Sequence, residues 1–221
     1  MIILLVGSPG SGKGTQARFI SERLAIPTIS TGDMLRAECE SETVLGLAAQ
    51  SILAAGRLVD DELVNAMVVN RLSRPDCGDG FILDGYPRTI PQAFFLDSFV
   101  EERGLPSPRV IHLDVPMPVL ISRLSSRWHC STCHRTYNLL YQPPARKGRC
   151  DVDDAMLVQR NDDTEQVVRQ RLESYHSLAG PLLDHYAGDR YHRIDGQCPP
   201  EDISRQIEEA LRPVAAIPRG R

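Results

Sequence analysis

The sequence predicts an α/β fold in which a parallel sheet is covered by helices on both faces. Short apolar segments alternate with longer helical patterns, and such alternation is typical of parallel sheets. A glycine-rich turn at residues 7–15 joins the first expected strand to the first expected helix. Two segments, residues 31–59 and 127–160, interrupt the alternation and are expected to be inserts on the core.

Five short apolar segments are expected to form the sheet. They are Ile2–Val6, Pro27–Ile29, Phe81–Leu83, Val110–Val115 and Tyr191–Ile194. The helical patterns between them are Gly14–Leu24, Asp61–Leu72, Pro91–Glu102 and Thr164–His185. The tail after Leu211 is rich in proline, so it is not expected to continue a helix and should be frayed.

The two inserts differ in composition. Residues 31–59 indicate consecutive helices without a strand, broken at Gly46 and closed by Gly56. Residues 127–160 are rich in Cys, Pro, Gly and Arg, with a short β-like stretch at Thr136–Tyr141. The second insert is therefore expected to be a small unit with little apolar core.

The overall composition is that of an ordinary globular protein. The 221 residues suffice for one sizeable core, and 42% of them are hydrophobic. The net charge of −4 gives no basic surplus for sequence-independent nucleic-acid binding. No apolar run is long enough for a signal peptide or a membrane span, so a cytoplasmic location is expected.

The cysteines fall into two groups. Three crowd into residues 130–150, and in an intracellular chain this pattern indicates a metal site rather than disulfides. The other three, Cys39, Cys77 and Cys198, are expected to pack as small apolar residues.

The glycine-rich turn is the strongest functional signal. Gly7-Ser8-Pro9-Gly10-Ser11-Gly12-Lys13-Gly14-Thr15 follows a strand and opens a helix, as a phosphate-binding P-loop requires. Its backbone N–H groups and the helix N-terminus suit phosphate oxygens, and Lys13 adds a full charge near the β and γ phosphates. A ligand-free strand-to-helix turn explains the spacing less well. Because Gly14 separates Lys13 from Thr15, the role of the Thr15 hydroxyl in Mg²⁺ coordination stays open.

Two carboxylates are candidates for holding Mg²⁺, through metal-bound water. Asp84 ends the third expected strand, where an acidic residue faces the phosphates at the carboxyl edge of the sheet. A solvated aspartate at a strand end is the alternative. Asp33 is the second candidate, and a helix N-cap is the alternative for it.

Cysteine spacing in the second insert predicts a zinc site. Cys130 and Cys133 form one close pair, and after 16 intervening residues Cys150 and Asp153 repeat the same gap, as in a zinc ribbon. Three thiolates select zinc or a similarly soft metal, and four protein ligands would make the site structural. Neighbouring residues compete for the fourth position: His129, His134, Asp151 and Asp154.

Four motifs, in order along the chain, resemble the adenylate kinase family of nucleoside monophosphate kinases, and the cysteine pattern is similar to that of zinc-bearing bacterial members. The motifs are Gly7–Gln16, Ser30–Arg36, Asp84–Thr89 and Arg160–Asp163. The third reads Asp-Gly-Tyr-Pro-Arg-Thr, so Tyr86 replaces the usual Phe. The resemblance implies a P-loop NTPase-type core with a five-stranded sheet (1–29, 60–126 and 165–221), a monophosphate-binding insert at 30–59 and a zinc-binding lid at 127–164.

The resemblance also implies a reaction, MgATP + AMP ⇌ 2 ADP, carried out by a monomer without nucleic-acid or membrane partners. The implied ATP-binding residues are Gly10, Ser11, Gly12, Lys13, Gly14, Thr15, Arg123, Arg127, Thr136, Tyr137 and a backbone group of Cys198. The implied AMP-binding residues are Thr31, Arg36, Arg57, Leu58, Val59, Gly85, Tyr86, Pro87, Arg88 and Gln92. Arg160 and Arg171 would reach both nucleotides, and the residues implied in catalysis are Lys13, Arg88, Arg123, Arg160 and Arg171.

The arginines suit phosphoryl transfer, which needs positioning and charge neutralisation more than covalent help. Arg123 and Arg127 are four residues apart in a helical pattern and are expected to share one face. No histidine has a catalytic context, and His112 is expected to be a hydrogen-bonded core residue. An acceptor phosphate is already ionised and needs no base.

Thr31 bears on the acceptor base, because the resemblance implies Thr in adenylate kinases and Ala in relatives that act on UMP or CMP. Its hydroxyl and the Gln92 amide are expected to contact adenine, although Thr31 could also cap the following helix. Two other interpretations stay open: another nucleotide pair, such as GTP as donor or UMP or CMP as acceptor, and a zinc-ribbon protein that binds NTP or nucleic acid.

Overall fold

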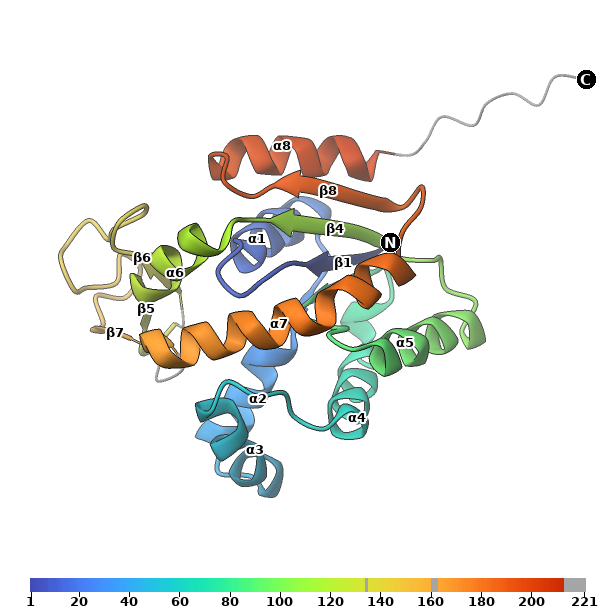
Figure 1. Cartoon of the computed structure of the whole chain (residues 1–221), viewed down its shortest axis with the longest axis horizontal. Coiled ribbons are helices and arrows are strands. Elements are labelled where there is room, and N and C mark those ends of the chain that lie inside the picture. The colour runs from blue at the N-terminus through green and yellow to red at the C-terminus, as the bar shows by residue number, and fades with distance from the viewer. Residues whose placement is uncertain (134, 160–162, 213–221) are drawn as a thin grey trace, which may run out of the picture.

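A computed structural model describes residues 1–133, 135–159 and 163–212 of the chain. Its centre is a five-stranded parallel sheet in the order β2-β3-β1-β4-β8 (Figure 1). The strands are β1 (Ile2–Val6), β2 (Thr28–Ser30), β3 (Phe81–Asp84), β4 (Arg109–Asp114) and β8 (Tyr191–Asp195). The predicted parallel sheet is confirmed, with every strand end within one residue of its predicted position.

Both faces of the sheet are buried, because successive β1 side chains point to opposite sides and all five are apolar. Ile2, Leu4 and Val6 belong to the larger apolar cluster, on one face. That cluster takes in α4 (Asp61–Leu72), α5 (Ile90–Glu102) and the C-terminal half of α7 (Glu165–His185). Ile3 and Leu5 pack on the other face, against α1 (Lys13–Leu24) and α8 (Pro200–Leu211). A short 3₁₀ helix, η1 (Pro75–Cys77), precedes β3.

Helix α8 was not predicted from the sequence. Ile203, Ile207 and Leu211 recur every four residues and form its buried face. Arg109, at the start of β4, holds its last turn, because one guanidinium nitrogen donates to the carbonyl of Ala210 at 2.7 Å and to that of Arg212 at 3.0 Å. The last carbonyls of a helix have no partner within it, so this side chain supplies one.

Residues 31–54 form two helices, α2 (Thr31–Glu40) and α3 (Val44–Ala54). The predicted break at Gly46 is wrong, because Gly46 lies inside the first turn of α3 and the break falls at residues 41–43. Thr43 starts the helix by accepting a hydrogen bond from Gly46 N at 3.0 Å. Glycine is needed there for close packing, since a Cβ would lie 2.0 Å from Glu38 O in α2.

Gly56 ends this insert, as the sequence predicts, with φ at +66°. It packs directly against α7. A Cβ at position 56 would lie 2.9 Å from Arg171 Cγ and 3.2 Å from Val167 O. The return of the insert is therefore in contact with the helix that carries Arg171.

A second, three-stranded antiparallel sheet lies beside the N-terminal end of α7, away from the main sheet (Figure 1). Its strands are β5 (Arg127–Cys130), β6 (Thr136–Asn138) and β7 (Leu157–Val158). Only four of its described residues form a buried cluster, and they are Cys130, Tyr137, Cys150 and Leu157. The prediction of a β-containing unit with little core is confirmed.

The predicted helical face shared by Arg123 and Arg127 is wrong. Helix α6 (Met117–Ser125) carries Arg123 but ends at Ser125, and Arg127 begins strand β5. Two serine hydroxyls bond back to the preceding turn, Ser125 to Ile121 O at 2.9 Å and Ser126 to Ser122 O at 2.7 Å. Such bonds compete with helical continuation and help to end the helix there.

The predictions for His112 and for the three scattered cysteines are also confirmed. His112 is buried in β4 and lies 2.6 Å from the Tyr191 hydroxyl through its Nδ1 atom. Cys77 is buried in the larger apolar cluster, while Cys39 and Cys198 are partly buried against apolar clusters. Among the described residues, no helix combines the length and apolar composition that crossing a membrane requires.

Candidate active site at the carboxyl edge of the sheet

The glycine-rich loop lies between β1 and α1, with its shape set by close backbone contacts. A Cβ on Gly7 would lie 2.6 Å from Leu113 O, and one on Gly10 would lie 2.8 Å from Leu124 Cγ. Gly7, Gly10 and Gly12 all have positive φ, which glycine adopts without strain. Ser11 is buried, and its hydroxyl has no hydrogen-bond partner among the described residues, so the loop retains a polar atom for a ligand.

Lys13 is the first residue of α1 and folds back over this loop. Its Nζ atom donates to Gly7 O at 2.7 Å and to Ser8 O at 3.0 Å. Burial lowers the pKa of Lys13 to about 8, the Asp84 carboxylate opposes this shift, and three arginines, led by Arg88, add to it. The loop therefore holds a cation whose charge an anionic ligand would stabilise.

Asp84 and Asp33 line one surface hollow at the edge of the loop, together with Gly14 and Ser30. A Cβ on Gly14 would lie 3.7 Å from Asp84 Oδ2, which places this carboxylate against the start of α1. Burial raises the pKa of Asp84, an effect that Lys13 opposes. Asp33 is not the helix cap, because Ser30 accepts the hydrogen bond of Asp33 N at 3.3 Å, and Asp33 forms an ion pair with Arg36. Two carboxylates on one hollow suit a hard cation such as Mg²⁺.

On the other side of Asp84, the turn Gly85–Arg88 gathers the residues implied in acceptor binding. Thr31 donates to Gly85 O at 2.9 Å, and because Ser30 caps α2, Thr31 does not. Arg88 is exposed, and its Nε atom donates to the same carbonyl at 2.7 Å. The Tyr86–Pro87 peptide bond is cis.

Gln92 is almost fully buried in the first turn of α5, at 2% exposure. Its Oε1 atom accepts from Arg88 N at 2.8 Å, and its Nε2 atom donates to the Asp61 carboxylate at 2.7 Å. Three other implied residues follow Gly56 where the insert returns to the core. These are Arg57, which is exposed, Leu58, which is partly buried, and Val59, which is buried.

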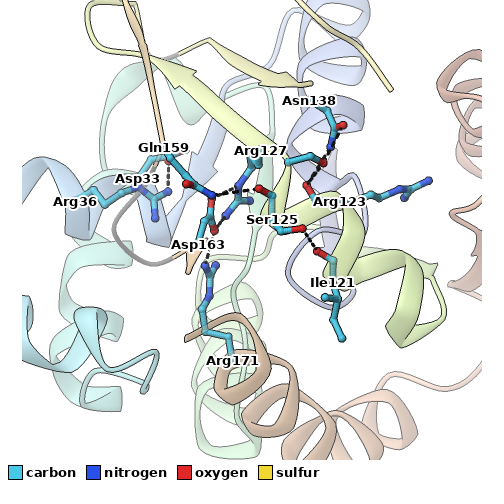
Figure 2. Close-up of polar contacts among 11 residues, drawn as sticks. Asp33, Arg36, Ile121, Arg123, Ser125, Arg127, Asn138, Gln159, Asp163 and Arg171 are labelled. Carbon is cyan, nitrogen blue, oxygen red and sulfur yellow. Dashed lines mark hydrogen bonds and ion pairs between the residues drawn. The ribbon is translucent and has the colours of Figure 1, made fainter. Parts of the chain in front are cut away.

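Two of the arginines converge on one buried carboxylate, as Figure 2 shows. The Asp163 side chain is 0% exposed, accepts from Arg127 Nε at 2.7 Å and accepts from Arg171 Nη1 at 3.2 Å. Arg127 comes from β5 and Arg171 from α7, so Asp163 joins the small sheet to the core helix. The shared carboxylate therefore holds the two guanidinium groups close together. Arg160 lies outside the described residues.

Arg123 extends away from this cluster in Figure 2. It lies near the aromatic ring of Tyr141. Its guanidinium carbon is 5.9 Å from the centre of the Tyr141 ring. Burial lowers the pKa of Arg123. A guanidinium and an aromatic ring at this spacing offer two flat surfaces on which a base can stack.

Three further residues implied in ATP binding lie apart from the arginine cluster. Thr136 is exposed on β6, whereas the Tyr137 side chain is buried within the small sheet, with its hydroxyl 3.3 Å from Cys150 Sγ. Cys198 follows β8 and packs against the apolar cluster of α1 and α8. Only the backbone of Tyr137 and Cys198 is therefore suited to a nucleotide contact.

The cysteine cluster forms a group that could bind a metal ion. Ligand atoms of Cys130, Cys133, Cys150 and Asp153 all lie within 4.8 Å of one another. Cys130 Sγ is 3.2 Å from Asp153 Oδ1, and Cys133 Sγ is 3.5 Å from Cys150 Sγ. A tetrahedral zinc–sulfur site with bonds of about 2.3 Å has edges of about 3.8 Å, so the spacing fits. A hydrogen bond from Ala155 N helps to lower the pKa of Asp153 to about 2.

The competing ligands are less well placed. Asp151 accepts a hydrogen bond from Ala145 N at 2.8 Å, and Asp154 forms an ion pair with Arg146 at 2.6 Å. His129 is not part of the four-residue cluster found among the described residues, and His134 lies outside them. The geometry thus favours the fourth ligand that the spacing predicts.

Comparison with known proteins agrees with this site. The sequence model of the adenylate kinase family matches residues 5–191. The chain belongs to the adenylate kinase family. It is 46% identical over 212 residues to an adenylate kinase of Caldicellulosiruptor bescii, covering 96% of this chain and 99% of that protein. Adenylate kinases of Listeria monocytogenes serotype 4a and Brevibacillus brevis are 44% and 45% identical, each over 96% of this chain and over 99% and 100% of the relative.

Sequence reasoning missed three residues that the structure brings to this adenylate kinase site. Asp163 stands in the fourth motif, so its position was visible but its burial between two arginines was not. Asp61 and Tyr141 belong to no motif, and the sequence carries no signal for their contacts with Gln92 and Arg123. Those contacts arise only when α4 packs on α5 and the small sheet folds beside α6.

Proposed function

We propose that the chain is an ATP:AMP phosphotransferase that reversibly moves the terminal phosphoryl group of MgATP to AMP, giving two ADP. The observation that carries this proposal is the grouping of cations at one edge of the sheet. Lys13 lies over the P-loop, Arg127 and Arg171 meet at Asp163, and Arg88 follows the turn after β3. Such a grouping suits two phosphorylated substrates brought end to end. Membership of the adenylate kinase family supports the choice of ATP and AMP.

The donor and acceptor sites are proposed on opposite sides of Asp84. The P-loop backbone, Lys13 and Ser11 would bind the ATP phosphates, while Arg123 and the Tyr141 ring would flank its base. Thr31, Gly85, Arg88 and Gln92 would bind AMP. Arg160 and Arg171 would contact both nucleotides.

Catalysis would depend on position and charge. The acceptor phosphate of AMP is already ionised, so no general base is needed, and Lys13 with the arginines would neutralise charge on the moving group. Asp33 and Asp84 would hold Mg²⁺ through water, and the bound ion would neutralise phosphate charge.

We further propose that Cys130, Cys133, Cys150 and Asp153 hold a structural zinc ion. Four protein ligands would leave no position for a substrate, and the ion would stabilise a small sheet with few buried residues. Residues 30–59 and 127–164 would act as movable parts on a core of 1–29, 60–126 and 165–221. Their closure would exclude water, so that transfer to AMP outruns ATP hydrolysis. The chain would act as a cytoplasmic monomer.

A coupled assay for ADP tests the proposal. ADP should form from MgATP plus AMP, and omission of AMP should abolish nearly all of it. Parallel reactions with GTP as donor, or with UMP or CMP as acceptor, separate this function from a different nucleotide specificity. ATP hydrolysis that does not respond to AMP would contradict it.

A further inference from the structure

A polar network joins the start of α4 to the start of α5, next to the turn proposed to bind AMP. The Asp61 carboxylate accepts one hydrogen bond on each oxygen. Oδ1 accepts from Gln92 Nε2 at 2.7 Å, and Oδ2 accepts from Thr89 Oγ1 at 2.8 Å. Both partners lie on or directly before α5, so the carboxylate ties the two helices together.

This network fixes which way the Gln92 amide faces. Its oxygen accepts from the backbone N–H of Arg88 at 2.8 Å, and its nitrogen faces the Asp61 carboxylate. A carboxylate only accepts and a backbone N–H only donates. Rotating the amide by half a turn would place oxygen against the carboxylate and N–H against N–H. The chemistry of the two partners therefore permits one orientation.

Capping of α4 does not require Asp61. The neighbouring Asp60 is the N-cap, and its Oδ1 atom accepts from Glu62 N at 3.0 Å and from Leu63 N at 3.3 Å. The Asp61 side chain is instead directed at α5. Its contacts serve Gln92 and Thr89 and leave the cap to its neighbour.

A second contact anchors the same turn from α4. The Tyr86 hydroxyl donates to Asn65 Oδ1 at 2.6 Å and lies 3.4 Å from the Gln92 carbonyl oxygen. Tyr86 is 1% exposed, so this hydroxyl is held inside the core. Both the side chain and the backbone of Gln92 are thus held by groups that connect to α4.

We propose that Asp61 is a positioning residue that holds the Gln92 amide in one orientation and so sets the base selectivity of the acceptor site. This inference rests on the proposed function, in which Gln92 faces the base of AMP. With one donor and one lone pair already used, the amide keeps one N–H and one lone pair for a base. That pair matches adenine, which presents a ring acceptor beside an amino group. Hypoxanthine, the base of inosine monophosphate (IMP), has the same size but reverses these roles.

The substitution Asp61→Asn removes the part of this constraint that comes from the carboxylate, with little change in size, because an amide both donates and accepts. Only the Arg88 N–H would then hold Gln92 in its orientation, so the rotated amide that suits hypoxanthine would cost less free energy than in the wild type. We expect the ratio of kcat/KM for AMP to that for IMP to fall by about tenfold, through a higher KM for AMP, while the KM for ATP stays within about twofold. Asp60→Asn is the matched control, since it removes the same charge one residue away and keeps a good cap, and its ratio should equal that of the wild type.

A double-mutant cycle distinguishes action through Gln92 from a general loss of structure. If Asp61 acts through Gln92, adding Asp61→Asn to Gln92→Ala should change the AMP-to-IMP ratio no further. The inference is overturned if Asp61→Asn keeps the wild-type ratio, if it changes the kinetics of ATP and AMP alike, or if the two effects add fully. A wild-type chain that forms no ADP from ATP and AMP would instead contradict the proposed function.

If Asp61→Asn does not fold, a measurement on the unmodified protein tests whether the Asp61 carboxylate holds the Gln92 amide. In a ¹H–¹⁵N spectrum, one of the Gln92 side-chain amide protons should exchange slowly with solvent because the carboxylate binds it. Exchange of both protons at the rate of an exposed amide would overturn the proposed anchoring.

Discussion

The P-loop and the small sheet are built in opposite ways. The loop follows β1, whose residues are at most 5% exposed, and two of its glycines, Gly7 and Gly10, pack closely against Leu113 and Leu124. The small sheet has four described residues in its buried cluster, and two of them are cysteines of the proposed metal site. Apolar burial shapes the first region, whereas the second has a cluster of side chains that could bind a metal ion.

The two regions therefore differ in what stabilises their structure in the absence of substrate. The loop keeps its shape without help, because the surrounding core is densely packed. A three-stranded sheet with so small a core is not expected to be stable alone. A metal ion would supply the missing stability while leaving the unit free to move as a body.

Metal removal should have the largest effect, and it should affect the small sheet without affecting the region around the P-loop. Structural zinc contributes about 10 kcal/mol or more in small zinc domains, so a chelator under reducing conditions should unfold the small sheet and leave the core folded. Trp128, the only tryptophan, lies in β5, so its emission should shift to the red while the main thermal transition persists.

A matched cysteine variant provides the control. Cys39→Ser should retain one metal ion per chain and normal Trp128 emission, whereas Cys150→Ser should lose both. The proposed role of the cluster would be contradicted if the purified chain contained no metal and its Trp128 emission did not change when chelator was added.

Replacing Lys13 with Met should leave both regions folded and stop the chemistry. Loss of one preorganised charge at a developing anion typically costs about 10³-fold in rate, so kcat should fall by about that factor. Metal content and Trp128 emission should not change. Coupled ADP assays and metal analysis check both statements, and wild-type turnover in the folded variant would remove the basis of the mechanism.

Asp163→Asn tests the contact between the small sheet and α7, which Asp163 makes through Arg127 and Arg171. Removing one partner of a buried ion pair typically costs about 3 kcal/mol or more, because a remaining charge stays buried without that partner. Denaturant unfolding should show this loss. Glu165→Gln removes an exposed partner of Arg169 on the same helix and should cost less than about 1 kcal/mol. Equal small losses in both variants would show that Asp163 does not hold the parts together.

The smallest expected effect is a proton taken up by Lys13. Burial lowers the pKa of Lys13 to about 8 in the folded protein, so much of its charge is lost as the pH rises above 8. The unfolded chain keeps that proton up to its ordinary pKa of about 10.4, so this group makes folding more favourable as the pH rises through that window. ATP binding at pH 8.5 should restore the charge and take up part of one proton. Calorimetry in buffers of different ionisation enthalpy measures this uptake, which should vanish in Lys13→Met.

The sequence predicted the main sheet and the P-loop well, because both depend on local patterns. Ile2–Val6 is continuously apolar, and the spacing of the glycines and Lys13 in the loop at residues 7–15 allows few alternatives. The predictions failed where a neighbour decides the local structure. Gly46 appeared to break a helix, but it serves the contact between α2 and α3, and two serine hydroxyls helped to end α6 before Arg127.

The candidate site likewise contains residues that the sequence predicted and contacts that it did not. The spacing of Cys130, Cys133, Cys150 and Asp153 identified a cluster that the structure brings together. The contacts of Asp61 and Asp163 could not be predicted, because each depends on elements that meet only in the folded chain. For Asp163, a motif supplied the residue and the fold supplied its two partners.

The close packing of Gly56 against α7 leaves no room for a side chain at this position. Because residue 56 has no side chain, the end of the insert lies directly against α7, the helix that carries Arg171. Even a methyl group there would collide with the Arg171 side chain and displace an arginine that is proposed to contact both nucleotides, although the methyl group itself would touch neither. A substitution at Gly56 is therefore expected to slow turnover without changing any residue that is proposed to contact a substrate.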